Sequence, residues 1–104
     1  DPAATRLLEA AAVAVLGADA VTTTEQSLGG EDFGWLLTRA PGAMARLGTR
    51  TPGGRTYDLH RGDLVVDERA VVAGACLLAR VGVLAGHHPP PAGPAPVLRN
   101  IPNP

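Results

Sequence analysis

The chain has 104 residues, of which 45% are hydrophobic and 18% charged, a balance typical of a folded segment and not of a disordered one. This length suffices for one small domain and hardly for two. Nine arginines, no lysine and ten acidic residues give a formal net charge of -1, so no positive field exists to hold a polyanion and we expect no nucleic-acid partner.

The number of cysteines and the length of the apolar stretches limit further which class of protein this chain can belong to. Cys76 is the only cysteine, which excludes an internal disulfide framework and weakly favours a reducing compartment, so we expect a cytoplasmic protein. The longest unbroken apolar stretches fall short of the ~20 residues that cross a bilayer, and no basic-then-apolar leader opens the chain. We therefore expect no membrane partner. Because the chain begins at Asp1 and not at methionine, we expect a trimmed or excised piece.

The first elements along the chain are a helix and a short strand. Asp1 can accept from the free amides of a first helical turn, and Pro2 is tolerated there. Apolar residues recur at helical spacing from there until Gly17, which ends the helix. Residues 21–24 are β-branched throughout and predict a strand.

A second helix and a second strand follow. Residues 27–30 form a loop with two adjacent glycines, and residues 31–39 predict a short helix with Phe33 and Trp35 as its core anchors. Residues 43–48 alternate their side chains with a period of two, which predicts a strand.

The second half of the chain predicts a loop and the strongest helix. Residues 51–54 read Thr-Pro-Gly-Gly and predict a flexible loop. Asp67 is placed to cap the helix that follows, and Glu68 complements its dipole. Cys76 is expected in that helix as a small core residue. It belongs to a wide apolar stripe made of Val71, Val72, Ala75, Cys76, Leu78, Ala79 and Val83.

The order of these elements predicts an α/β fold. Residues 1–86 are expected to fold, whereas residues 87–104 hold seven of the ten prolines and predict a tail or linker. Two short strands make a marginal sheet, and the apolar stripe of the last helix needs a larger layer to cover it. We therefore expect part of a larger domain.

One candidate site is the segment Gly29, Gly30, Glu31, Asp32 and Phe33. Paired glycines let a ligand approach the backbone closely and leave free amides at the start of the next helix, where anions are favoured. The two acidic residues could instead be ordinary first-turn acids that complement the helix dipole, and the pattern alone favours this interpretation.

His60 is the other candidate. It follows a glycine-rich loop and has Asp58 and Asp63 nearby, which suits a metal ligand or an acid–base group. The alternative is an ordinary surface histidine, since no second histidine or cysteine stands at ligand spacing. A stand-alone enzyme built on His60 and one of these aspartates has little support.

A series of short motifs runs in unbroken order over residues 1–85: Ser27-Leu28-Gly29-Gly30-Glu31-Asp32-Phe33, Pro41-Gly42-Ala43, Leu47-Gly48, Leu59-His60, Val66-Asp67-Glu68 and Gly74-Ala75. This series resembles the C-terminal part of the catalytic domain in metal-dependent amidohydrolases. These include hippurate hydrolase, N-acyl-amino-acid deacylases and auxin-conjugate hydrolases, within the aminoacylase-like zinc metallopeptidase superfamily.

The resemblance implies a fold and a chemistry for a parent enzyme. It implies an α/β/α sandwich, interrupted by an inserted dimerisation domain, that hydrolyses N-acyl amino acids or small peptide-like substrates through a metal-activated water. It implies two divalent metal ions (Zn, Mn, Co or Ni), with His60 as the one ligand contributed late in the chain. Gly29, Gly30, Glu31, Asp32 and Phe33 would line the substrate cleft. A homodimer and contact with the remainder of the catalytic domain are implied as well.

The sequence also departs from the family. Arg61-Gly62 stands after His60, where the family usually has Ser-Pro, and the other metal ligands and the base-bearing carboxylate pair are absent. We therefore expect no turnover from the isolated chain. The alternative hypothesis is a non-catalytic binding or assembly module derived from such an enzyme, which would use its apolar faces to dock a partner.

Overall fold

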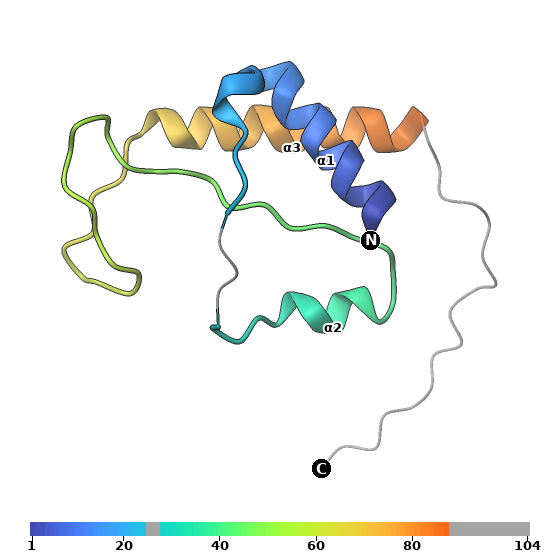
Figure 1. Cartoon of the computed structure of the whole chain (residues 1–104), viewed down its shortest axis with the longest axis horizontal. Helices are drawn as coiled ribbons and strands as arrows, with labels where there is room; N and C mark the ends of the chain where they lie inside the picture. Colours follow the sequence, from blue (N-terminus) through green and yellow to red (C-terminus); the bar gives the residue numbers. More distant parts are fainter. Residues whose placement is uncertain (25–27, 88–104) are drawn as a thin grey trace, which may run out of the picture.

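The computed structural model describes residues 1–24 and 28–87, and this part of the chain is helical. Its elements are α1 (Pro2–Leu16), the 3-10 turn η1 (Ala18–Ala20), α2 (Phe33–Leu37) and α3 (Arg69–His87). Figure 1 shows α1 lying across α3, with α2 apart from both on the segment that follows.

The first helix confirms its predicted signals. The Ala4 amide donates to Asp1 Oδ1 at 2.8 Å, which satisfies one free amide of the first turn. At the other end, Gly17 has φ 86° and its amide donates to the Val13 carbonyl at 2.9 Å. Only a residue without Cβ adopts that conformation at little cost, so the helix ends there.

The predicted apolar face of α1 is the face that packs. Ala11 is fully buried, and the neighbouring apolar side chains on the same face are half-buried against α3: Leu7, Leu8, Ala12, Val15 and Leu16. On α3, the buried residue is Ala70, which is 9% exposed. Helix-on-helix packing through small residues is thus the core of the described structure.

The apolar stripe predicted for α3 lies on its uncovered side. All seven of its members are exposed, with Leu78 at 72% and Val71 at 69%. Cys76 is exposed too, so the prediction that it is a core residue was wrong. The covered positions of α3 are a different set: Ala70, Ala73, Gly74, Leu77, Val81 and Leu84. The helix is therefore apolar on all sides, which is typical of a helix enclosed by other structure.

The predicted α/β sandwich fold was wrong for the described residues, which contain no strand. Residues 21–24 and 43–48 carry strand-like patterns, but neither meets a partner strand. A strand is stabilised by hydrogen bonds and side-chain pairs from its neighbour, so the pattern alone does not form one. Helices satisfy their backbone groups internally and form without such a neighbour.

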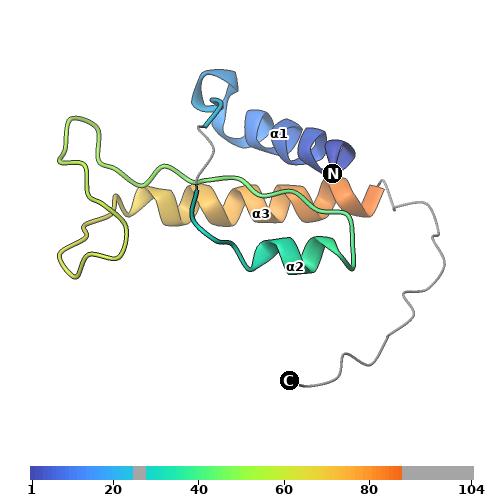
Figure 2. The same ribbon diagram turned by 60° about the horizontal axis from the view of Figure 1, so that its bottom comes forward.

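The segment 43–49 runs beside α3 instead of forming a strand (Figure 2). A methyl group added at Gly74 would lie 3.1 Å from Leu47 Cδ2, so the Leu47 side chain lies directly against α3 at this glycine. The Asp67 amide donates to the Thr49 carbonyl at 2.7 Å and ties the segment to the start of α3. The two ends of the loop formed by residues 50–66 therefore lie next to each other.

The short helix α2 is smaller and more open than predicted. It covers Phe33–Leu37 and not the whole of residues 31–39. Trp35 is 74% exposed, so the prediction that it anchors a core was wrong, whereas Phe33 is half-buried. The predicted proline-rich tail lies outside the described residues, except for His87 at the end of α3.

The helix α3 is long and apolar enough to cross a membrane, judged by length and composition, with a mean hydropathy of 1.7. Arg80 lies within it, and a charged residue near the middle of a spanning helix is costly. The same length and hydropathy suit a helix enclosed by protein. The absence of a membrane partner therefore stays a prediction.

Candidate functional site

His60 lies in the loop of residues 50–66, which projects beyond the first turn of α3 (Figure 1). A turn begins this loop, where the Gly54 amide donates to the Thr51 carbonyl at 2.8 Å and Gly53 takes φ 71°. The loop predicted from the glycine-rich residues 51–54 is therefore found at that position. The loop is held at its base by the bond between Asp67 and Thr49.

The backbone at His60 is unusual. Its φ of 66° is the only positive value at a non-glycine residue in the described part of the chain. Asn, Asp and His adopt this left-handed region more readily than other residues with a side chain. The side chain is exposed, and no interaction with another described residue engages its imidazole. Both ring nitrogens are thus accessible from outside the loop.

Charged groups organise the loop around His60. Arg61 donates from Nε to Asp63 Oδ1 at 2.7 Å and from Nη2 to Oδ2 at 2.9 Å, a bidentate ion pair. Arg55 approaches the same carboxylate at 3.8 Å and lies over the Tyr57 ring, 4.9 Å from its centroid. The Arg61 hydrogen bonds lower the pKa of Asp63 below its ordinary value, which keeps this carboxylate charged.

The second predicted site lies before α2. Gly29, Gly30, Glu31 and Asp32 are exposed, and Phe33 is half-buried as the first residue of the helix. Asp32 occupies the cap position, but its side chain makes no capping hydrogen bond. The helix turn is instead closed by the backbone, through the Trp35 amide and the Asp32 carbonyl at 3.0 Å.

The structure does not bring the two predicted sites together. The loop that carries His60 and the segment that leads into α2 stand apart in both views of the ribbon (Figures 1 and 2). Within residues 1–24 and 28–87, no group of three or more histidine, cysteine or acidic side chains is placed to hold a metal ion. The described residues therefore supply single donors and not a complete metal site.

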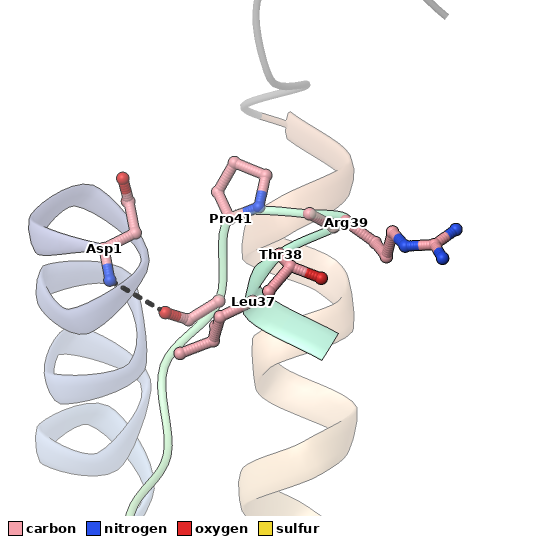
Figure 3. Close-up of a pocket in the computed structure, with 7 residues that line it drawn as sticks. Asp1, Leu37, Thr38, Arg39 and Pro41 are labelled. Carbon is pink, nitrogen blue, oxygen red and sulfur yellow. Dashed lines mark hydrogen bonds between the residues drawn. The ribbon is translucent and has the colours of Figure 1, made fainter. Parts of the chain in front are cut away.

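A cavity of about 410 Å³ lies elsewhere, between the end of α2 and the start of α1 (Figure 3). The Asp1 ammonium donates to the Gly42 carbonyl at 3.0 Å across it, and Leu37 and Arg39 border it. The cavity is open to solvent, and none of the predicted site residues lines it. Its polar lining consists of Asp1, Thr38 and Arg39.

The ion pair between Arg61 and Asp63 is the feature that the sequence reasoning missed. Asp63 lies three residues after His60, and Arg61-Gly62 departs from the family pattern. The missed signal was the spacing of opposite charges two residues apart, directly after the candidate histidine. That spacing allows a bidentate pair across a turn.

Comparison with curated proteins links this chain to enzymes over part of its length. It is 38% identical over 64 residues to the N-acetyldiaminopimelate deacetylase of Anoxybacillus flavithermus, which covers 62% of this chain and 16% of that enzyme. It is 46% identical over 57 residues to a protein of Synechocystis sp. named "Probable hydrolase", covering 53% of this chain and 14% of that protein.

A third relative carries a different name. The chain is 45% identical over 74 residues to a Rhodococcus jostii protein provisionally named glutamate–cysteine ligase 2-3, covering 71% of this chain and 9% of that protein. Because 74 residues are 9% of the ligase and 64 are 16% of the deacetylase, the ligase chain is about twice as long.

The chain matches only a small part of each of these relatives. The chain spans between 9% and 16% of the length of these three relatives. No protein-family model matches it, and no solved structure matches it significantly. The chain is related to enzymes, and in part it resembles hydrolases of the amidohydrolase type.

Proposed function

We propose that this chain is a segment of a metal-dependent amidohydrolase that cleaves the amide bond of N-acyl amino acids or small peptide-like substrates. The observation that carries the proposal is the match to deacetylases and a hydrolase, together with a histidine presented at the surface of a closed loop. N-acetyldiaminopimelate is itself an N-acyl amino acid, so the names of these relatives agree with the substrate class.

His60 is the residue that would bind a metal ion. An accessible neutral imidazole is a common ligand for divalent transition metals, and the ring of His60 has no competing partner among the described residues. Divalent cations, when bound, lower the pKa of water and polarise an amide carbonyl. With no second ligand grouped beside it, His60 fits the role of one ligand in a site completed by other parts of a longer protein.

Gly29, Gly30, Glu31, Asp32 and Phe33 would form one wall of the substrate cleft in this proposal. Their exposure before α2 leaves their backbone amides and carboxylates open to a ligand. The wall and His60 would have to meet through elements contributed by the rest of the protein, since the described residues hold them apart.

The remainder of the catalytic domain is the partner that the described surface fits best. The uncovered face of α3 is apolar from Val71 to Val83, and Trp35 and Leu36 of α2 are also exposed. Exposed apolar area on this scale is unusual for a self-sufficient domain. The relatives are roughly six to eleven times as long as the matched segments, which supplies enough chain to cover these faces.

The test measures amide hydrolysis and metal content in the longer polypeptide that carries this segment. Release of acetate from N-acetyl amino acids should require a divalent metal. The substitution His60→Ala should lower kcat/KM by at least about a hundredfold, because loss of an outer-shell partner alone costs ten- to a hundredfold. It should also reduce the bound metal found by elemental analysis. His87→Ala, at the exposed end of α3, is the matched control and should change neither quantity.

The isolated 104 residues should show no turnover on the same substrates, with or without added Zn²⁺ or Mn²⁺. Their described part offers two separate imidazoles, His60 and His87, and no grouped ligands. Catalytic groups that act as a unit lose nearly all their effect when most are absent. Release of an amino acid by the isolated chain would contradict the proposal.

A non-catalytic assembly module is the second candidate, and the exposed apolar face of α3 favours it equally. The two differ in what accompanies the segment. An amidohydrolase needs further cysteine, histidine and glutamate ligands in the same polypeptide, whereas a module needs only the apolar faces. A full reading frame without those ligands, together with a metal-free purified protein, would support the module.

A further inference from the structure

Four residues form a connected group around one carboxylate in the loop of residues 50–66: Asp63, Arg61, Arg55 and Tyr57, the Asp63 cluster. Arg61 pairs with both carboxylate oxygens of Asp63 at 2.7 and 2.9 Å, and Arg55 reaches Oδ2 at 3.8 Å. Tyr57 lies under the Arg55 guanidinium at 4.9 Å.

The Asp63 cluster brackets His60 in sequence. Arg55 lies before the histidine and Arg61 directly after it, so one carboxylate ties together both sides of the turn. The backbone adds a weaker link, in which the Leu64 amide donates to the Arg61 carbonyl at 3.4 Å. Bidentate guanidinium–carboxylate pairs fix direction as well as distance, so the plane of Arg61 relative to Asp63 is determined.

His60 is the residue that such a closure would constrain. Its φ of 66° belongs to a region that residues with a Cβ rarely occupy, and such conformations persist when the surroundings determine them. The imidazole itself has no interaction with another described residue that could hold it there. The loop backbone and the charges that close the loop are the remaining interactions near His60.

We propose that Asp63, through its ion pairs with Arg61 and Arg55, is a positioning residue that holds His60 in the left-handed conformation and so fixes the direction in which its imidazole is presented. The inference rests on the proposed function only for the purpose of that presentation, which is to offer the ring to a metal ion. The conformational statement stands by itself and is tested separately.

The cluster is exposed, which shapes the expected effect. The side chains of Arg61 and Asp63 are 43% and 51% exposed, and exposed ion pairs contribute little to global stability. Breaking the cluster should thus release His60 without unfolding α1 or α3. A role in folding alone would instead change helix content and leave no specific signature at His60.

The experiment uses the full 104-residue chain labelled with ¹⁵N and compares three substitutions by NMR. A strong nuclear Overhauser effect between the amide and α protons of one residue reports a positive φ. Asp63→Asn keeps the shape but removes both ion pairs, and should abolish this signal at His60. Asp63→Glu retains the carboxylate and should restore it. Asp58→Asn, an exposed acid of the same loop outside the Asp63 cluster, should leave it unchanged.

Two results with the Asp63→Asn and Asp58→Asn variants would overturn the proposal. One is a positive φ that persists at His60 in Asp63→Asn. The other is loss of the signal in Asp58→Asn as well, which would make the effect one of general charge. If Asp63→Asn lowers helix content, Arg61→Gln removes the bidentate pair from the other side, and a signal retained at His60 in that variant also overturns the proposal.

A titration with Co²⁺ alone separates this inference from the proposed function. We expect paramagnetic shifts centred on His60 in the wild-type chain. In Asp63→Asn the range of these shifts should become smaller. Shifts centred only on His87 would count against His60 as a metal ligand and leave the conformational result intact. Shifts at His60 that are identical in Asp63→Asn would count against Asp63 and leave the ligand role intact.

Discussion

Two glycines of α3 provide a direct measurement of how closely residues 43–49 approach the helix. Gly74 and Gly82 both lie in the helix interior, where alanine is more favourable than glycine by about 1 kcal/mol. Nothing lies within 4 Å of a methyl group at Gly82, whereas one at Gly74 would meet Leu47 Cδ2 at 3.1 Å. The two substitutions share their backbone effect and differ in this contact.

Gly82→Ala should raise the free energy of unfolding by close to the full ~1 kcal/mol. Gly74→Ala should gain much less, because Leu47 must move by a few tenths of an ångström to accept the methyl group. Leu47 is 41% exposed and has room to rotate, so we expect a cost of about 0.5–1.5 kcal/mol for a displaced rotamer and a net change near zero.

Urea unfolding followed by far-ultraviolet circular dichroism measures both values. Truncating the neighbour should restore the missing gain, so Gly74→Ala should stabilise a Leu47→Ala background by about 1 kcal/mol. Equal stabilisation by Gly74→Ala and Gly82→Ala in the wild-type background would refute the reasoning. It would mean that residues 43–49 do not lie against α3.

Three further predictions concern the helix ends and the uncovered face. Asp1→Ala should destabilise α1 by about 1 kcal/mol in the same urea assay, while Asp1→Asn should retain most of the capping; equal loss in both would exclude a capping role. Arg69 holds the pKa of Asp67 at about 2, below its ordinary 3.8, so the stabilisation it gives α3 should be present above pH 3.8 and lost as the pH falls through 2. Amide hydrogen exchange at Arg69 should report this loss, and Asp67→Asn should remove the pH dependence. Cys76 is exposed, so maleimide should label it readily in the isolated chain and slowly in a longer protein that covers α3; equal labelling rates would contradict that cover.

The sequence predicted the helices well because their signals are local. Asp1 and Gly17 delimit α1, and Asp67 accepts from the Arg69 amide at 3.0 Å at the start of α3. Each of these contacts is made between residues close in the chain, so no knowledge of distant structure is needed to predict them.

The predicted strands failed because their signals are not local. Residues 43–48 have a strand-like alternation, but the neighbour that would pair with them is not among the described residues, and they lie along a helix instead. The prediction that the apolar stripe of α3 is its buried face was wrong for a related reason. An all-apolar helix does not reveal which of its faces will be covered, and in this structure the covered face carries Ala70 and Gly74.

The candidate site was predictable in its residues and not in its geometry. His60 could be singled out from its loop and neighbours, but its left-handed φ and the pairing of Asp63 with Arg61 depend on side-chain placement across a turn. The distance between His60 and the segment before α2 depends on how separate elements pack. No spacing in the sequence encodes that distance.

The bond between the Asp67 amide and the Thr49 carbonyl makes the loop of residues 50–66 an independent unit of the chain. Because both ends of the loop meet at this one point, its interior can be lengthened, shortened or replaced while α1 and α3 keep their contact. Compact loops of this kind carry their own packing and diverge freely in length between related proteins. Transplanting residues 50–66 between relatives should therefore exchange the residues around His60 as a block and leave the helical framework as it is.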